Sequence, residues 1–233
     1  MRPGIDTLQG LPLLATCTPA MLTRLNAVSD LARLGPDEVL FREGDQVNEL
    51  NILISGYAVT TRSQPNGDGT VIDVVEPIAP IGLPAALLGG ASPIGGRTVT
   101  SARIVVLDAI ELRAMTRKLP AVAASFLDYA LKELQNQNLE NSRLKVMTAA
   151  QRLADYLLGL INEPDVGPAR FVLPFEKRLL AAKLGCSQEN LSRIFGTLRS
   201  IGVTTRDKIV VVRSVSELRE YVGVSNAQSV PTS

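Results

Sequence analysis

The stretch Gly185–Val203, GCSQENLSRIFGTLRSIGV, sets four polar side chains at the start of a short apolar helix. Apolar residues recur at helical spacing and predict the face that packs against the rest of its domain: Leu191, Ile194, Phe195, Leu198 and Ile201. The polar side chains lie at or near the helix start, mostly on the other face: Gln188, Glu189, Ser192 and Arg193. This pattern predicts a helix that is anchored by one face and offers its first turn to a partner. The alternative is a solvated face with a Glu189–Arg193 pair four residues apart.

The neighbouring segments complete a known supersecondary motif. Residues 175–185 (FEKRLLAAKLG) predict a first helix, the turn CSQ follows it, and residues 204–213 (TTRDKIVVVR) predict a hairpin after the second helix. Helix, glycine-containing turn, helix and hairpin in this order indicate a winged helix-turn-helix, whose second helix enters the DNA major groove. There Arg193 can donate two hydrogen bonds to guanine, Glu189 can accept one from cytosine, and Gln188 can reach adenine or a phosphate.

The first half of the chain has a different sequence pattern. From about Ser29 to Leu112, short β-rich runs alternate with turn signals, which predicts a β sandwich or roll. The named runs are EVLFREGD, LNILISGYAVTTR, TVIDVVEPI and RTVTSARIVVLD, with a hairpin turn expected at Asn66-Gly67-Asp68-Gly69. Residues 77–96 hold too much Gly, Pro and Ala for a regular strand and are expected to form a loop around a short helix. Short helices are expected over residues 1–27, one of them capped by Thr18.

A single long helix is predicted from Ala121 to about Lys145, because this segment contains no Gly or Pro. A seven-residue spacing runs through it and predicts pairing with another helix. The candidate dimerisation residues are Leu127, Ala130, Leu134, Gln137 and Asn141. The alternative is a core helix packed on its own β domain. The expected domains are residues 1–118 (helices and roll), 119–146 (dimerisation helix) and 147–233 (winged helix-turn-helix).

Composition narrows the function. The chain of 233 residues contains no histidine, which excludes histidine-dependent acid–base catalysis, His-ligated zinc and His-ligated haem. Neither a catalytic site nor a metal site is therefore expected. Residues 1–144 carry 12 basic and 15 acidic residues, and residues 145–233 carry 12 and 8, so the C-terminal part is the basic one. The chain shows no secretory signal, no run of about eighteen apolar residues and only two isolated cysteines, so a cytoplasmic protein without a membrane span is expected.

Three segments together resemble the CRP/FNR family of bacterial transcription regulators: LFREGD with LISGYAV in the roll, TAAQRLADYLL after the long helix, and LGCSQENLSRIFGTL at the DNA site. The resemblance implies an α+β chain with a β-roll effector domain, a dimerisation helix and a winged helix-turn-helix. It also implies a homodimer that binds double-stranded promoter DNA and meets RNA polymerase. Glu189 to Arg193 form the E-x-x-S-R pattern, which resembles the FNR side and implies a TTGAT-like half-site. Phosphate contacts are expected from Lys177, Arg178, Ser187 and Lys208, and Cys186 is expected to serve packing.

The chain departs from its relatives at the residues that would bind an effector. Cyclic-nucleotide-binding members carry Gly-Glu followed by Arg-Ser/Thr-Ala, whereas this chain has Gly82-Leu83-Pro84 and keeps Arg97-Thr98-Val99, which argues against a cyclic nucleotide. Cys17 alone cannot hold an iron–sulfur cluster. What remains resembles the nitrogen-oxide-responsive DNR/NNR-like branch, which implies nitric oxide sensing through haem with a ligand other than histidine, or held in a loose apolar site.

The residues expected to line an effector pocket are Gly82, Leu83, Leu87, Arg97 and Thr98. Another small effector and regulation without any effector stay open. So does a function without DNA, in which the roll binds a small molecule and the C-terminal domain binds protein.

Overall fold

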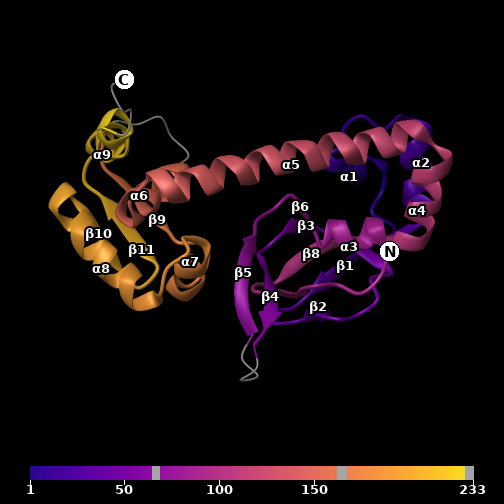
Figure 1. Ribbon diagram of the computed structural model, residues 1–233, viewed down its shortest axis with the longest axis horizontal. Helices are drawn as coiled ribbons and strands as arrows, with labels where there is room; N and C mark the ends of the chain where they lie inside the picture. The colour runs from indigo at the N-terminus through magenta and orange to yellow at the C-terminus, as the bar shows by residue number, and fades with distance from the viewer. Residues whose placement is uncertain (65–68, 162–166, 229–233) are drawn as a thin grey trace. The chain divides into compact units, whose positions relative to one another are not determined.

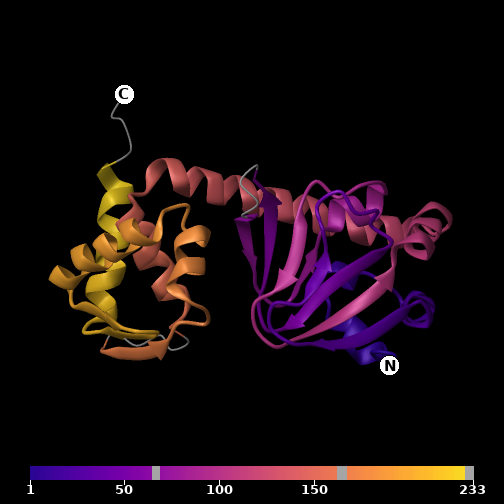
Figure 2. The same cartoon turned by 90° about the horizontal axis from the view of Figure 1, so that it is seen from below.

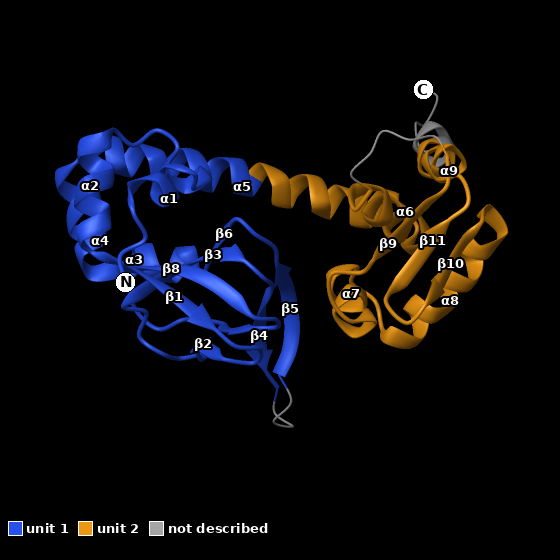
Figure 3. Cartoon of the chain, turned by 180° about the vertical axis from the view of Figure 1, so that it is seen from behind, with its two compact units in different colours: residues 1–134 blue, residues 135–233 orange. Residues whose placement is uncertain are grey.

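The computed structural model describes residues 1–64, 69–161 and 167–228. The chain divides into two compact units, residues 1–134 and 135–233 (Figure 3). The long helix α5 (Pro120–Val146) contributes its first part to unit 1 and its last part to unit 2. Among the described residues, none of the helices is long and apolar enough to cross a membrane.

Unit 1 contains two antiparallel four-stranded sheets (Figures 1 and 2). The first has the order β1 (Ser29–Leu34), β8 (Ala102–Asp108), β3 (Glu49–Ser55), β6 (Ala79–Ile81). The second has the order β2 (Val39–Phe41), β7 (Gly95–Thr98), β4 (Ala58–Ser63), β5 (Gly69–Val75). This confirms the expected β-roll.

The strands alternate between two apolar cores, as the two-residue period of a β-strand requires. On β8, Ala102 and Ile104 lie in a cluster with residues of both sheets, among them Phe41 of β2. Val105 and Leu107 point the other way, into a larger cluster with the helices. The helices that share this cluster are α1 (Ile5–Gln9), η1 (Pro12–Leu14), α2 (Pro19–Ala27), α3 (Leu83–Leu88), α4 (Ala109–Lys118) and the start of α5. Each leucine buried in this way contributes about 1.5–3 kcal/mol to folding.

Two expectations for unit 1 need correction, and the expected cap at Thr18 is confirmed. Thr18 caps α2 as expected, because its hydroxyl accepts a hydrogen bond from the Met21 amide at 3.4 Å. The β-rich region was expected to continue to about Leu112, but helix α4 begins at Ala109, directly after β8. Strand β6 lies inside the stretch expected to lack a regular strand, and α3 is the short helix expected there.

The structure gives a physical reason for both corrections. Strand β6 is an edge strand of three residues, where Pro80 removes no hydrogen bond that a further strand would need. Asp108 ends β8 and caps α4 at once, since its carboxylate accepts from the Ile110 and Glu111 amides at 2.8 and 3.0 Å. The expected hairpin turn at residues 66–69 lies mostly outside the described residues, although β4 and β5 do pair antiparallel.

Unit 2 contains α6 (Ala149–Gly159), β9 (Ala169–Val172), α7 (Lys177–Lys183), α8 (Gln188–Leu198), η2 (Arg199–Ile201), β10 (Val203–Arg206), β11 (Ile209–Val212) and α9 (Val215–Gln228). The strands form one antiparallel sheet in the order β10-β11-β9. The element order α7, α8, β10, β11 is that of the predicted winged helix-turn-helix. Residues 162–166, between α6 and β9, lie outside the described residues.

Candidate nucleic-acid interface and effector site

The turn between α7 and α8 is fixed by backbone hydrogen bonds. The Cys186 amide donates to the Ala181 carbonyl at 2.9 Å and the Gly185 amide donates to the Ala182 carbonyl at 3.0 Å. These two bonds form a Schellman motif, which needs a left-handed residue after the helix. Gly185 supplies it with φ +66°. The turn therefore sets the direction in which α8 leaves α7.

The first turn of α8 is polar and exposed. Ser187 caps it, because its hydroxyl accepts from the Asn190 amide at 3.2 Å. Glu189 and Arg193 form an ion pair at 2.6 Å, with their side chains 78% and 76% exposed. An exposed pair at this spacing is worth about 0.5 kcal/mol or less, so it orients the guanidinium without holding it away from a partner. Gln188 and Ser192 are also exposed, and the Ser192 hydroxyl donates to the Gln188 carbonyl at 3.1 Å.

The opposite face of α8 anchors the helix. Leu191, Ile194, Phe195 and Leu198 are all buried, and Ile201 is half-buried in η2. The ammonium group of Lys177 on α7 lies 5.4 Å from the centre of the Phe195 ring on α8. Lys177 therefore also contributes to the packing of α7 against α8. Four buried side chains at helical spacing hold the polar turn at the surface.

The remaining phosphate candidates lie on exposed positions around α8. Arg178 is exposed on the first turn of α7, and Lys208 is exposed at the tip of the β10–β11 hairpin. Residues 177–213 carry eight Lys and Arg against two acidic residues. Two further arginines that were not predicted as phosphate contacts, Arg199 and Arg206, are exposed after α8 and at the end of β10. Arg199 falls seven residues after Ser192, and that helical spacing was the signal for it.

Gly202 joins α8 and the wing. Its φ is +77°, and a β-carbon added to it would lie 2.7 Å from the Arg213 β-carbon. The Arg213 amide also donates to the Gly202 carbonyl at 3.0 Å. This position therefore requires glycine for both its backbone conformation and its close approach to the end of β11.

The cysteine of the turn, Cys186, is half-buried. Burial raises the pKa of its thiol, and the guanidinium of Arg152 opposes this shift in part. A thiol with a raised pKa forms little thiolate near neutral pH, which is a poor setting for redox chemistry.

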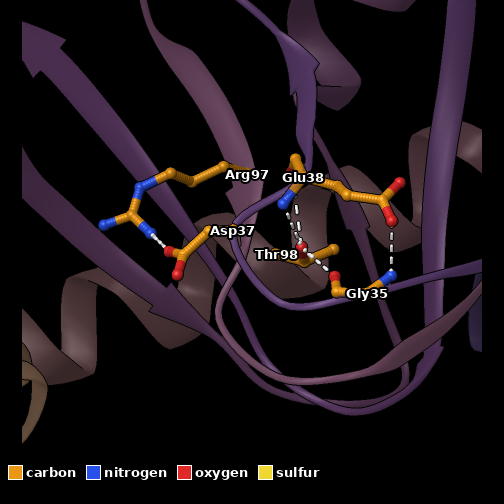
Figure 4. Close-up of polar contacts among 5 residues, drawn as sticks. All are labelled: Gly35, Asp37, Glu38, Arg97 and Thr98. Atoms are coloured by element: carbon orange, nitrogen blue, oxygen red, sulfur yellow. Dashed lines mark hydrogen bonds and ion pairs between the residues drawn. The ribbon is translucent and has the colours of Figure 1, made fainter.

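In unit 1, the two polar effector candidates are engaged within the protein (Figure 4). Arg97 forms an ion pair with Asp37. Thr98 is fully buried, and its hydroxyl donates to the Gly35 carbonyl at 2.7 Å and accepts from the Glu38 amide at 2.9 Å. The two side chains thus bind the loop between β1 and β2.

The apolar effector candidates pack into the two cores. Leu83 is 8% exposed in the cluster under the helices, and Leu87 packs against the same cluster. Gly82 faces the ring of Phe41, which would lie 2.9 Å from an added β-carbon. Cys17 packs against the helical cluster as well, and burial raises the pKa of its thiol. Within the described part of the chain, no group of three or more acidic or cysteine side chains is placed to hold a metal ion.

The dimerisation candidates lie on the exposed length of α5. Buried residues occur only near its start, at Val122, Ser125 and Phe126. Leu127 and Leu134 are 58% and 53% exposed, and Ala130, Gln137 and Asn141 are exposed too. Leu131, which was not among the predicted residues, is 51% exposed and lies one turn after Leu127. The apolar stripe beyond Phe126 therefore has no partner among the described residues.

Comparison with known proteins identifies both halves of the chain. A family model for the cyclic nucleotide-binding domain matches residues 31–118, and one for the Crp-like helix-turn-helix domain matches residues 151–221. The chain belongs to the CRP/FNR family of transcription regulators. The DNR/NNR-like branch within that family remains a prediction.

Two curated proteins match most of this chain at modest identity. The cyclic AMP receptor protein of Thermus thermophilus is 27% identical over 164 residues, which are 70% of this chain and 74% of the relative. The transcriptional activator protein FnrL of Cereibacter sphaeroides is 23% identical over 234 residues, covering 93% of this chain and 90% of the relative.

Solved structures agree with the fold. A Ruegeria pomeroyi protein provisionally named a cyclic nucleotide binding protein has a TM-score of 0.70 and 25% identity, over 92% of this chain and 95% of its own. FixK2 of Bradyrhizobium japonicum, at 18% identity, has a TM-score of 0.67 over 83% of this chain and 96% of its own. The latter likeness concerns the fold alone.

Proposed function

We propose that this CRP/FNR-family chain is a homodimeric regulator that reads promoter DNA with the first turn of α8. One observation carries the proposal: Gln188, Glu189 and Arg193 are exposed at the start of a helix whose other face is buried. A recognition helix in the major groove uses its N-terminal residues to contact base edges. In this account Arg193 donates to a guanine and Glu189 accepts from a cytosine. The expected half-site is TTGAT-like.

The phosphate backbone supplies affinity in this proposal. Arg178 on α7, Ser187 at the cap of α8 and Lys208 at the tip of the hairpin are all exposed. Residues 177–213 carry eight basic residues against two acidic ones. Contacts to phosphate fix the register of a protein on DNA and release counterions, so affinity falls steeply with salt. Lys177 contributes less in this account, because its ammonium packs on Phe195.

Dimerisation occurs through α5. The exposed leucines at positions 127, 131 and 134 have the spacing of a helix that pairs with another helix, and Gln137 and Asn141 continue the stripe with polar residues that fix register. Two reading heads about one helical turn apart then bind an inverted repeat, about 10 base pairs between half-site centres. The dimer is expected to contact RNA polymerase when it is bound at a promoter.

The effector differs from a cyclic nucleotide in this proposal. A nucleotide phosphate at β7 would have to displace Asp37 from Arg97, and the buried Leu83 offers no carboxylate to a ribose hydroxyl. The residues at this site therefore do not support cyclic AMP binding by this chain, although one relative is named a cyclic AMP receptor protein. Haem fits these residues poorly too, because Leu83 is buried in the helical core and Leu87 packs against that core. Burial also raises the pKa of the Cys17 and Cys186 thiols, which disfavours a thiolate ligand. Nitric oxide sensing and regulation without an effector both remain predictions.

The test is a gel-shift titration of full-length protein on a duplex that the protein itself selects from a randomised pool. We expect retardation at low salt and a fall in affinity by a factor of about 10³ or more between 50 and 200 mM salt, as for six or more phosphate contacts. Arg178→Gln should flatten the salt slope by about one unit and leave the selected sequence unchanged. Absence of any selected duplex would refute the proposal and favour a protein-binding C-terminal unit.

A further inference from the structure

Arg152 on α6 joins two helix ends that are far apart in the sequence. Its Nη1 atom donates to the carbonyl of Met147, the residue after α5, at 2.9 Å. Its Nη2 atom donates to the carbonyl of Leu184, the C-cap of α7, at 3.2 Å. All three residues belong to unit 2, so these contacts lie within one compact body.

Both acceptors are carbonyls that a helix leaves without an internal partner. The last carbonyls of a helix also carry the negative end of its dipole, which favours a cation beside them. A planar guanidinium presents its donors in a fixed fork, so the direction from one carbonyl to the other is set by its geometry. A lysine in the same place has one compact head and sets no such angle.

Two sets of contacts connect α6 to the end of α5. Arg143 of α5 pairs with Asp155 in the middle of α6 at 3.2 Å. Thr148 and Gln151 form a capping box at the α5–α6 junction, with Gln151 almost fully buried. Arg152 thus connects this junction to Leu184, the first residue of the α7–α8 turn.

We infer that Arg152 is a positioning residue, which fixes the angle between the end of the dimerisation helix and the reading helix and thereby sets the half-site spacing that the dimer accepts. The Schellman turn transmits the position of Leu184 to α8, because its hydrogen bonds hold Gly185 and Cys186 to α7. The inference rests on the proposed function, since spacing has a meaning only for a dimer on DNA.

The test measures affinity against spacing. Full-length wild type and Arg152→Gln are titrated on the self-selected duplex and on versions with the half-sites moved one or two base pairs closer or further apart. Wild type should prefer the selected spacing, and in Arg152→Gln that preference should fall about tenfold, the size of one lost charge-assisted hydrogen bond. Arg219→Gln is the matched control, because Arg219 is exposed on α9, and it should keep the wild-type preference.

The outcomes separate the inference from the function it rests on. A wild type that selects no duplex refutes the proposed function. A wild type with a sharp spacing preference that Arg152→Gln retains overturns the role of Arg152 alone. A uniform loss of affinity at every spacing also overturns it, because that result indicates a merely structural arginine. Where Arg152→Gln does not give a cooperative melt, Arg152→Lys replaces it, with the same expected loss of preference.

Discussion

Leu134 gives the dimer proposal a quantitative test. Its side chain is 53% exposed in the single chain and lies on the seven-residue stripe of α5. Full burial of a leucine contributes about 1.5–3 kcal/mol, so burying the exposed half contributes about 1 kcal/mol for each copy. The symmetric interface contains two copies, and Leu134→Ala should weaken the dimer by about 2 kcal/mol before any cavity effect. That corresponds to an increase of about 30-fold in the dimer dissociation constant.

Sedimentation equilibrium over a range of protein concentrations measures this constant directly. Leu139→Ala is the matched control, because Leu139 lies on the same helix, is 62% exposed and falls opposite the stripe in the seven-residue pattern. We expect the control to leave the constant unchanged. Equal effects of the two substitutions, or none from Leu134→Ala, would refute the stripe as the dimer interface.

Further predictions concern two glycines, the Arg97–Asp37 ion pair and Glu43. Gly185→Ala should lower the free energy of unfolding in urea by about 1 kcal/mol. Only the positive φ at this position disfavours alanine, because the nearest atom to the added β-carbon is 3.9 Å away. Gly202→Ala should cost at least about 1 kcal/mol more, because its β-carbon also meets Arg213 at 2.7 Å, and equal costs would contradict this. Millimolar cyclic AMP should leave the melting temperature unchanged, and a rise that saturates with ligand would show that the β7 arginine can leave its aspartate. The Ser63 amide lowers the pKa of Glu43 below 4.5, so this contribution to stability is present above pH 4.5 and is lost as pH falls through the lower folded value. Glu43→Gln should therefore lose stability less steeply on acidification, and an identical acid profile would argue against the bond.

The sequence predicted the winged helix-turn-helix well because its signals are local. The αL glycine at 185, the serine cap at 187 and the apolar spacing from Leu191 to Leu198 each act within a few residues. The long helix α5 was predicted for the same reason, since a run without Gly or Pro needs no tertiary information.

Helix α4 was missed although a local signal existed. Asp108 followed three residues later by Glu111 is a helix-start pattern, but it lies at the end of a strand without an intervening turn. The contacts of the effector candidates depend on tertiary structure more than the start of α4 does. Nothing near Arg97 in the sequence indicates that Asp37, sixty residues earlier, would take its guanidinium. The same holds for Arg152, whose acceptor on Leu184 is brought close only by the packing of α6 against the turn.

Base reading by the first turn of α8 is the central claim, and Arg193 tests it most directly. The measurement compares the sequences that full-length wild type and Arg193→Ala select from one randomised pool. The account predicts that Arg193→Ala loses discrimination at one base pair, repeated symmetrically in both half-sites, by about 1–3 kcal/mol for each half-site. The other positions should keep their preferences. Identical selected sequences from the two proteins would contradict the claim.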